Sequence, residues 1–222
     1  MRSQHFDGIC HRIATAFARS RNGLPGHFLR STRDRPKIAH RGERTRFRLE
    51  ATPSDAWHTT LHRALKANAV RLFTYVPDRV LTPLIEAIQA DSEITSLAAS
   101  REEEALGILS GAWMAGMFGV LAMQTSGFAT LPNALASLAV PYQIPLVMVI
   151  SERGTLGEFN LGQAMVCRTM RPVLDALGIE HHTITRRDEL AFIADRSIKQ
   201  AVGTRAACAL ILSPLLTGGK VL

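Results

Sequence analysis

The sequence predicts an α/β fold with a doubly wound, mostly parallel sheet of six strands and helices on both faces. Short apolar runs rich in β-branched residues alternate with helix-length segments from about residue 51 onward. One of these runs, 145–151 (PLVMVIS), is wholly apolar, as is typical of a parallel strand covered on both faces. The composition, 46% hydrophobic and 20% charged over 222 residues, is that of a globular protein with a sizeable core.

The elements follow in order along the chain. Ser54 and Asp55 are residue types that cap a helix, which we expect to run to about Asn68. Pro77-Asp78 turns the chain after the first strand, and Ser126-Gly127 turns it after the third. We expect strands at 70–75, 94–98, 119–124, 145–151, 179–184 and 207–212. We expect helices at 54–68, 79–90, 102–116 and 131–140, a loop or helical region up to residue 177, and a last helix between the final two strands.

The positive charge of the chain is confined to its beginning. Residues 1–50 hold 12 Lys and Arg against 4 Asp and Glu, a net charge of +8, whereas residues 51–222 hold 14 against 15 and give the total of +7. A nucleic-acid-binding arm, an organelle transit peptide and a disordered extension are all compatible with residues 1–50. We favour the disordered extension, because the stretch 30–48 has little apolar periodicity, and we expect no nucleic-acid partner.

A run of 47 residues, 105–151, contains no charged side chain. Its first 19 residues approach the length of a membrane span, but glycines at 116 and 119 interrupt them and a strand-like run follows. We therefore expect a helix and two strands buried on all sides, and no membrane partner. Since a chain of this size has difficulty burying so much surface alone, we expect another chain to cover part of it.

Few other side chains indicate a metal or covalent site. Cys10, Cys167 and Cys208 are too scattered for a disulfide framework or a four-ligand zinc site, so we expect a reducing, cytoplasmic compartment. His58 and His62 are four residues apart, but no third ligand is evident, so we expect a solvated helix face and no metal bound by this chain.

Three adjacent glutamates, 102–104, follow the second expected strand and begin an otherwise uncharged helix. They are compatible with simple complementation of the helix dipole. Ligands of open α/β sheets, however, bind at the carboxyl ends of strands, so a glutamate at this place is also a candidate acid–base group. Burial and the neighbouring acids would raise its pKa, whereas the helix N-terminus would lower it, and the sequence leaves the sign open.

Several segments together resemble the pyrimidine-binding domain of thiamine-diphosphate-dependent decarboxylases, over about residues 54–215. Glu102 is followed by a small residue, Ala105, at the third position and by Gly111 at the ninth, which is the family's spacing; a slip of one residue would select Glu103. The resemblance is strongest to the phosphonopyruvate and sulfopyruvate decarboxylase branch, in the form of the separate alpha subunit of the sulfopyruvate enzyme. The other segments that carry it are 75–78, 123–128, 133–138, 150–154, 156–158, 171–172 and 174–179.

The resemblance implies a mechanism and a set of site residues. Glu102 would be the catalytic residue that hydrogen-bonds the aminopyrimidine of thiamine diphosphate, and the bound cofactor would then decarboxylate a 2-oxo acid. Gln124, Ser126, Gly127 and Asn133 would line the cofactor pocket. Arg153 would meet the second negative charge of the substrate, or only hold its own loop. With sulfopyruvate as substrate, the products would be sulfoacetaldehyde and CO2.

The family binds Mg2+ and the diphosphate on a second domain, through a Gly-Asp-Gly motif and a downstream Asn pair, and this chain has neither. The resemblance therefore implies a hetero-oligomer in which a beta subunit holds the metal and the diphosphate. Two alternatives remain open: a phosphonopyruvate decarboxylase subunit, and a non-catalytic interaction subunit with the same fold.

Overall fold

The computed structural model describes residues 56–219, which form a six-stranded sheet in which every strand pair is parallel. The strand order is β2-β1-β3-β4-β6-β5. The predicted fold class is confirmed, with a wholly parallel sheet. The strands are β1 (Leu72–Tyr75), β2 (Thr95–Ala98), β3 (Gly119–Gln124), β4 (Leu146–Ser151), β5 (Glu180–Ile184) and β6 (Ala207–Leu212).

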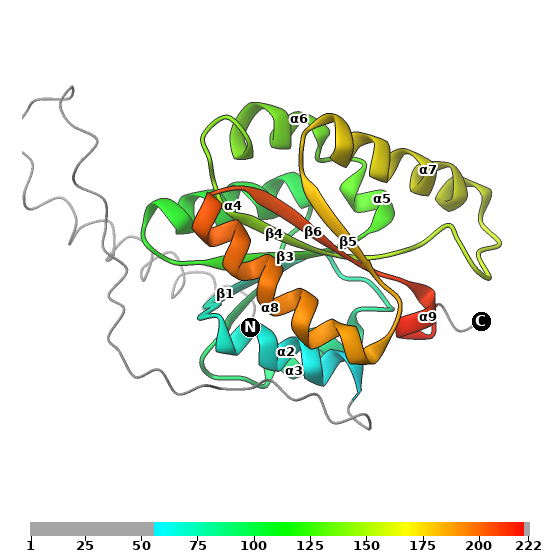
Figure 1. The fold of residues 1–222 in the computed structure, drawn as a ribbon, viewed down its shortest axis with the longest axis horizontal. Helices are drawn as coiled ribbons and strands as arrows, with labels where there is room; N and C mark the ends of the chain where they lie inside the picture. The colour runs from blue at the N-terminus through cyan, green and yellow to red at the C-terminus, as the bar shows by residue number, and fades with distance from the viewer. Residues whose placement is uncertain (1–55, 220–222) are drawn as a thin grey trace, which may run out of the picture.

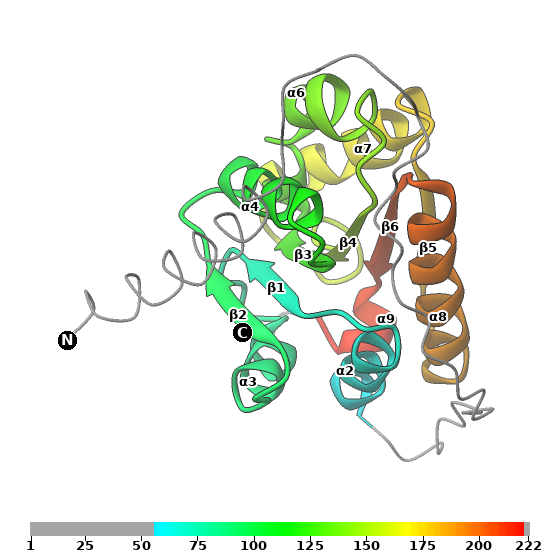
Figure 2. The same ribbon diagram turned by 90° about the vertical axis from the view of Figure 1, so that its left-hand side faces the viewer.

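Two layers of helices flank the sheet (Figures 1 and 2). Parallel crossovers are right-handed, so connections that run in opposite directions along the sheet lie on opposite faces. The connections from β1 to β2 and from β5 to β6 therefore share one face with α2 (Trp57–Ala67), and consist of α3 (Thr82–Gln89) and α8 (Arg187–Thr204). The opposite face carries α4 (Glu102–Met114), α5 (Thr125–Phe128), α6 (Pro132–Ala134), the π-helical segment η1 (Leu135–Ala139) and α7 (Leu161–Ala176).

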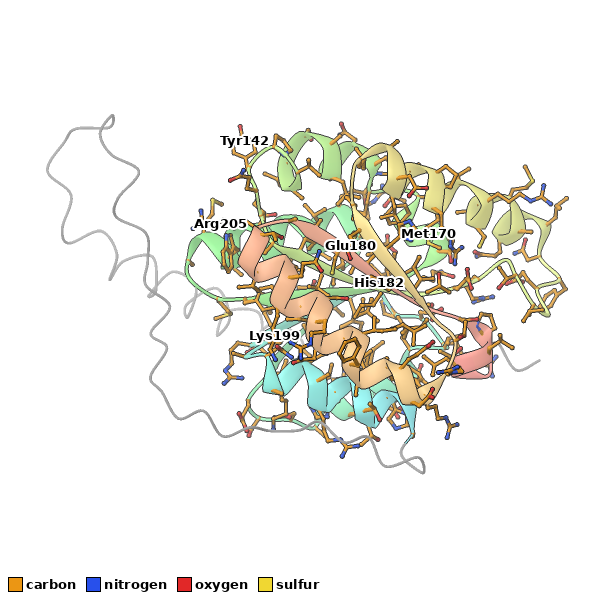
Figure 3. The ribbon with its side chains drawn as sticks, in the orientation of Figure 1. Tyr142, Met170, Glu180, His182, Lys199 and Arg205 are labelled. Atoms are coloured by element: carbon orange, nitrogen blue, oxygen red, sulfur yellow. The ribbon has the colours of Figure 1, made fainter. Side chains whose placement is uncertain are left out.

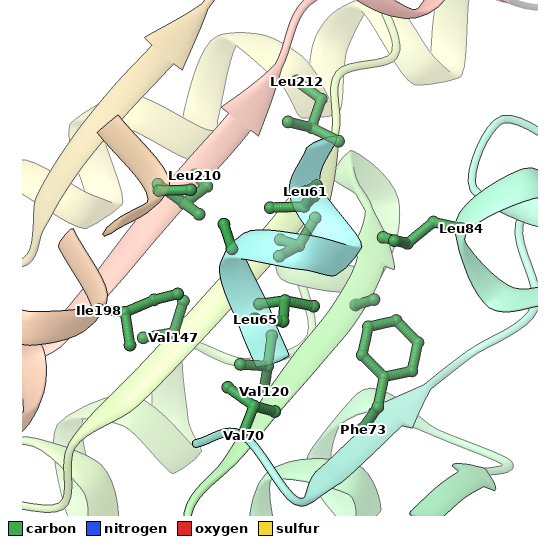
Figure 4. Close-up of a cluster of buried hydrophobic side chains, with 14 of the residues drawn as sticks. Leu61, Leu65, Val70, Phe73, Leu84, Val120, Val147, Ile198, Leu210 and Leu212 are labelled. Carbon is green, nitrogen blue, oxygen red and sulfur yellow. The ribbon is translucent and has the colours of Figure 1, made fainter. Parts of the chain in front are cut away.

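The core consists of two clusters, one on each face of the sheet, because successive strand residues point to opposite faces. On β3, Val120 and Ala122 belong to the cluster beneath α2, α3 and α8, whereas Leu121 and Met123 belong to the other cluster. Figure 4 shows Leu61 and Leu65 of α2 among side chains from the central strands. β3 is buried along its length apart from the half-buried Gln124, and β4 is wholly buried, so the wholly apolar run marks a central strand, as predicted.

Three local predictions differ from the structure. The N-cap of α2 is Ala56, without a side-chain hydrogen bond; Ser54 and Asp55 lie outside the described residues, as does the whole of residues 1–50. The expected turn at Ser126-Gly127 lies inside the short helix α5. The expected helix at 131–140 is divided, because Pro132 begins α6 and the chain then widens into η1. The helix α9 (Pro214–Thr217) was not predicted.

The strand order positions the functional edge of the sheet. The connection from β1 leads toward β2, whereas the connection from its neighbour β3 leads the other way, toward β4. Such a reversal opens a crevice at the carboxyl ends of the two strands, where ligands of this fold class bind. The segments that follow β1, β2, β3 and β4 all reach this edge.

The uncharged segment 105–151 is only partly covered within the chain. β3 and β4 are central strands, but Gly107 and Met114 of α4 are exposed, and the side chain of Tyr142 extends from the surface (Figure 3). The expectation that another chain covers part of this segment therefore stays a prediction. No helix within 56–219 is long and apolar enough to cross a membrane.

Candidate active site at the carboxyl edge of the sheet

The three glutamates that begin α4 have different environments. Glu104 accepts a hydrogen bond from the Ser100 backbone N–H at 2.8 Å, so its side chain provides an acceptor for a backbone donor just before the helix. Glu103 is half-buried, and its Oε2 has no hydrogen-bond partner within 56–219. Glu102 is buried, with 8% of its surface exposed. Helix-dipole complementation accounts for Glu104 but gives no reason to bury Glu102.

The carboxyl group of Glu102 lies against Gly127, which belongs to α5, the short helix directly after β3. A Cβ atom placed on Gly127 would stand 2.5 Å from Cδ and 2.8 Å from Cγ of Glu102, and closer still to Oε1. Real Cβ atoms essentially never come nearer than 3.0 Å to another heavy atom. The residue at position 127 must therefore lack a side chain if the carboxyl group is to occupy its place.

Burial raises the pKa of Glu102 above its ordinary value. A hydrogen bond from its own backbone N–H lowers the pKa by less, and the negative charge of Glu103 raises it further. The sign that the sequence left open is thus decided by desolvation. A raised pKa makes the group a candidate general acid.

The other predicted pocket residues are distributed unevenly around Glu102. Gln124 ends β3, Ser126 lies in α5 together with Gly127, and both Gln124 and Ser126 are half-buried. Asn133 lies farther along the chain on the exposed surface of α6, where its backbone carbonyl accepts a hydrogen bond from Ser137. The structure therefore brings Glu102 and Gly127 into contact, with Gln124 and Ser126 in the adjoining turn.

A buried hydrogen-bond network joins the segments that follow β1, β3 and β4. Thr125 Oγ1 donates to the Ser151 carbonyl at 3.2 Å and accepts from the Arg153 backbone N–H at 2.9 Å. Ser151 Oγ donates to Asp78 Oδ1 at 2.8 Å, and Asp78 also receives the backbone N–H groups of Val80 and Leu81. This network fixes the turn that carries Gly127.

Sequence reasoning assigned no role to Thr125, Ser151 or Asp78. The sequence indicates only a turn at Asp78, and it gives no role to Thr125, which stands between the candidate residues Gln124 and Ser126. The usable signal was their position, because all three are polar residues at or just beyond the ends of apolar strands.

Arg153 is also buried at this edge, with two carboxylates beside it. Its Nε lies 3.2 Å from Glu158 Oε2, and its Nη1 lies 3.7 Å from Asp78 Oδ2. Burial acts to raise the pKa of Glu158, but the Asn160 backbone N–H and Arg153 together hold it below its ordinary value. Glu158 is therefore a carboxylate that balances the charge of Arg153.

A cavity of about 310 Å³ lies beside this ion pair, between the loop after β4 and the segment after β6. Arg153 and Glu158 form part of its wall, and Leu156, Phe159 and Leu215 contribute apolar surface. Glu102 does not line it. The edge thus holds two neighbouring features, the contact between Glu102 and Gly127 and the cavity at Arg153, joined by the Thr125 network.

The remaining candidates are structural within the described part of the chain. No group of three or more His, Cys, Asp or Glu side chains there could hold a metal ion. His62 lies 2.8 Å from Asp91 Oδ2, which it shares with Lys66. Cys167 and Cys208 are buried, and burial raises the pKa of both thiols, that of Cys208 to about 12.

No family model matches the chain, but known proteins resemble it. The alpha subunit of sulfopyruvate decarboxylase from Methanocaldococcus jannaschii is 38% identical over 119 residues, which cover 54% of this chain and 70% of that protein. The same subunit from Methanothermobacter thermautotrophicus is 33% identical over 63% of this chain and 87% of that protein. Phosphonopyruvate decarboxylase from Streptomyces viridochromogenes is 36% identical over 55% of this chain but only 32% of that longer protein.

A solved structure shares the fold at low sequence identity. It is the 2-oxoglutarate:ferredoxin oxidoreductase of Magnetococcus marinus, with 2-oxoglutarate, coenzyme A and succinyl-CoA bound. The TM-score is 0.58 at 13% identity, over 73% of this chain and 29% of that one.

Proposed function

This chain belongs to the family of sulfopyruvate decarboxylase alpha subunits, and from this premise we propose that it is the pyrimidine-binding half of a thiamine-diphosphate-dependent 2-oxo acid decarboxylase. The relatives that establish the family are decarboxylases by name, which makes carbon–carbon bond cleavage with release of CO2 the reaction class. The preferred substrate is sulfopyruvate, since both alpha subunits are named for it.

The observation that carries the proposal is the buried Glu102 carboxyl group packed against Gly127. Its pKa is raised by burial, and no ion pair within 56–219 neutralises it. A desolvated carboxyl group of this kind can hydrogen-bond a neutral ring such as an aminopyrimidine, and it disfavours a phosphate, which is also an anion. The residues present therefore fit the cofactor's ring.

Each residue of the edge has a part in this proposal. Glu102 holds a proton at its carboxyl oxygen and shares it with the pyrimidine nitrogen, and Gly127 leaves that carboxyl group its place. Gln124 and Ser126 orient the ring from the same turn, and Asn133 borders the site from α6. When bound, thiamine diphosphate supplies a thiazolium that accepts the electrons released by decarboxylation. The apolar side chains behind Glu102, including Ala105 and Leu106, exclude water.

The proposal includes a beta subunit that holds Mg2+ and the diphosphate. The phosphonopyruvate decarboxylase supports this, because the part that aligns with this chain accounts for 32% of its length and most of that protein lies outside the match. The described residues also offer no cluster of metal ligands. A hetero-oligomer would supply in two chains what that relative carries in one.

The test is CO2 release from sulfopyruvate, with phosphonopyruvate and pyruvate in parallel, by this chain alone and by the chain co-expressed with the subunit encoded beside it, with thiamine diphosphate and Mg2+ present. We expect turnover only in the co-expressed sample. Glu102→Gln should abolish it, and Glu103→Gln is the matched control for the neighbouring carboxyl group. Loss of activity in the control alone would move the role to Glu103.

The substrate arms separate the alternatives. Preference for phosphonopyruvate would assign the chain to the activity of the Streptomyces relative instead. Absence of turnover on every 2-oxo acid, with the two subunits shown to associate, would refute the decarboxylase and leave an interaction subunit with the same fold.

A further inference from the structure

The ion pair between Arg153 and Glu158 joins two residues that are held in different ways. Arg153 is fixed, because its backbone N–H donates to Thr125 Oγ1 and its guanidinium lies beside Asp78. Glu158 stands on the loop between β4 and α7, in which Thr155, Leu156, Gly157 and Phe159 are exposed. A movement of the loop would therefore separate Glu158 from an arginine that stays in place.

The two glycines of this loop differ in how tightly they are packed. Both Gly154 and Gly157 have positive φ angles, of 96° and 74°. A Cβ atom on Gly154 would stand 2.6 Å from Cys167 Cβ, so this end of the loop is packed tightly against α7. Around Gly157 there is open space, with no atom within 4 Å of an added Cβ. Position 157 is next to Glu158, so the carboxylate stands on the part of the loop that has open space around it.

The cavity of about 310 Å³ borders both members of the pair, and its wall offers one fixed cation. The guanidinium of Arg153 has a planar fork of donors that matches a carboxylate, a sulfonate or a phosphonate equally well. Its Nε is directed at Glu158, at 3.2 Å, and both side chains are shielded from water, with 10% and 5% of their surfaces exposed. A ligand anion can therefore reach this face of Arg153 only by replacing Glu158.

We propose that Glu158 is an internal competitor for the second anionic group of the substrate, which must displace Glu158 from Arg153 in order to bind. The inference rests on the proposed function and adds the determinant of substrate choice. For a sulfonate the exchange conserves charge, because one singly charged anion leaves the guanidinium as another arrives. A 2-oxo acid without a second anionic group, such as pyruvate, cannot make the exchange, since it would leave Arg153 buried without that partner.

The exchange is measured by binding of 3-sulfopropanoate to the assembled two-subunit complex. This compound carries the sulfonate and the carboxylate but has no ketone, so its affinity is read by calorimetry without turnover. Propanoate is the probe without the second anion, and 3-phosphonopropanoate distinguishes a phosphonate from a sulfonate. Glu158→Gln removes the competing charge and keeps the size of the side chain. Glu93→Gln is the matched control, because Glu93 is paired with Lys66 in the segment before β2, away from the cavity.

We expect Glu158→Gln to lower the Kd of 3-sulfopropanoate about tenfold, which corresponds to about 1.4 kcal/mol and lies near the lower end of what a hydrogen bond to a charged group contributes. The Kd of propanoate should not change, and Glu93→Gln should change neither. With sulfopyruvate, the KM of Glu158→Gln should fall while kcat is retained.

An unchanged or higher Kd for 3-sulfopropanoate in Glu158→Gln would overturn the proposal, as would an equal effect on propanoate. Arg153→Gln provides the second variant, in which the affinity for 3-sulfopropanoate should be lost while the complex still assembles. Since binding is measured without turnover, a failed exchange in a complex that decarboxylates sulfopyruvate would refute only this inference. Absence of turnover in the unaltered complex would instead refute the proposed function.

Discussion

The contact between Gly127 and Glu102 allows a substitution whose effects on activity and stability should separate. In Gly127→Ala the added methyl group would stand 2.5 Å from Cδ of Glu102, whereas ordinary contact begins at 3.4 Å. The difference between these distances means that Cδ must retreat by at least about 0.9 Å, and Oε1, which lies closer still, must move farther. The atoms that obstruct the methyl group are the end of one flexible side chain, so the turn itself can stay in place.

A displacement of about 1 Å at a catalytic group can lower the rate about 100-fold, and this is the loss of kcat that we expect for Gly127→Ala in the assembled enzyme. Stability should change little. Replacement of glycine by alanine within a helix contributes about 0.5–1 kcal/mol, which offsets much of the cost of moving Glu102. The φ of Gly127 is not positive, so alanine can adopt the backbone conformation.

The measurement is kcat by CO2 release together with the free energy of unfolding in urea. Gly203→Ala in α8 is the matched control, because an added Cβ at that position meets no atom within 4 Å, and α8 covers the opposite face of the sheet. The control should keep full activity. If Gly127→Ala also kept its kcat, the carboxyl group packed against this glycine would not be the catalytic one, and the assignment of Glu102 would fail.

Three further substitutions test the electrostatics and the packing of the domain by urea unfolding. Glu102→Gln should be more stable than the wild type at pH 7. Burial raises the folded-state pKa of Glu102, so the ionised carboxylate destabilises the folded protein above that pKa. The difference in unfolding free energy between variant and wild type should vanish below about pH 4, where the carboxyl group is protonated in both states. A variant equally stable at both pH values would contradict the raised pKa. Thr125→Val should lower the free energy of unfolding by about 1–3 kcal/mol, because it leaves the backbone N–H of Arg153 buried without its acceptor. An unchanged midpoint of urea unfolding would mean that this network does not hold the segment after β3. Asp91→Asn should destabilise the protein at pH 7, because Lys66 holds the pKa of Asp91 at about 2 in the folded state. The difference in unfolding free energy between variant and wild type should disappear as the pH falls from about 4 through 2. A difference that persists below pH 2 would contradict the ion pair.

The exposed part of the uncharged segment 105–151 supports the expectation of a partner chain on physical grounds. An isolated chain gains nothing by keeping Met114 and Tyr142, each about three-quarters exposed, in contact with water. Met114 shares its side of α4 with Gly107 and Gly111, where an added Cβ would meet open space. Bulky substitutions at these two glycines are therefore suited to mapping the subunit interface without disturbing the core.

The sequence by itself determined the layers of the fold. Strands 119–124 and 207–212 have the predicted bounds, because apolar runs of strand length, bounded by turn residues, have few other ways to bury themselves. The beginning of α4 at Glu102 was also predicted, since acidic residues favour the first turn of a helix and an apolar run of helix length follows these three. The family spacing selected Glu102 over Glu103, and Glu102 is the more deeply buried of the two in the structure.

Only the tertiary structure decided the environment of that glutamate and the residues that support it. The sign of the pKa shift of Glu102 depends on desolvation by segments distant in the chain, among them a glycine 25 residues later, and no local pattern encodes that contact. The hydrogen bond between Ser151 and Asp78 joins residues 73 positions apart, and the pairing of Arg153 with Glu158 depends on the path of a loop. The local periodicity of apolar residues predicts which side chains are buried. The hydrogen-bond partner of a buried polar group, in contrast, depends on how the strands assemble and bring their carboxyl ends to one edge of the sheet.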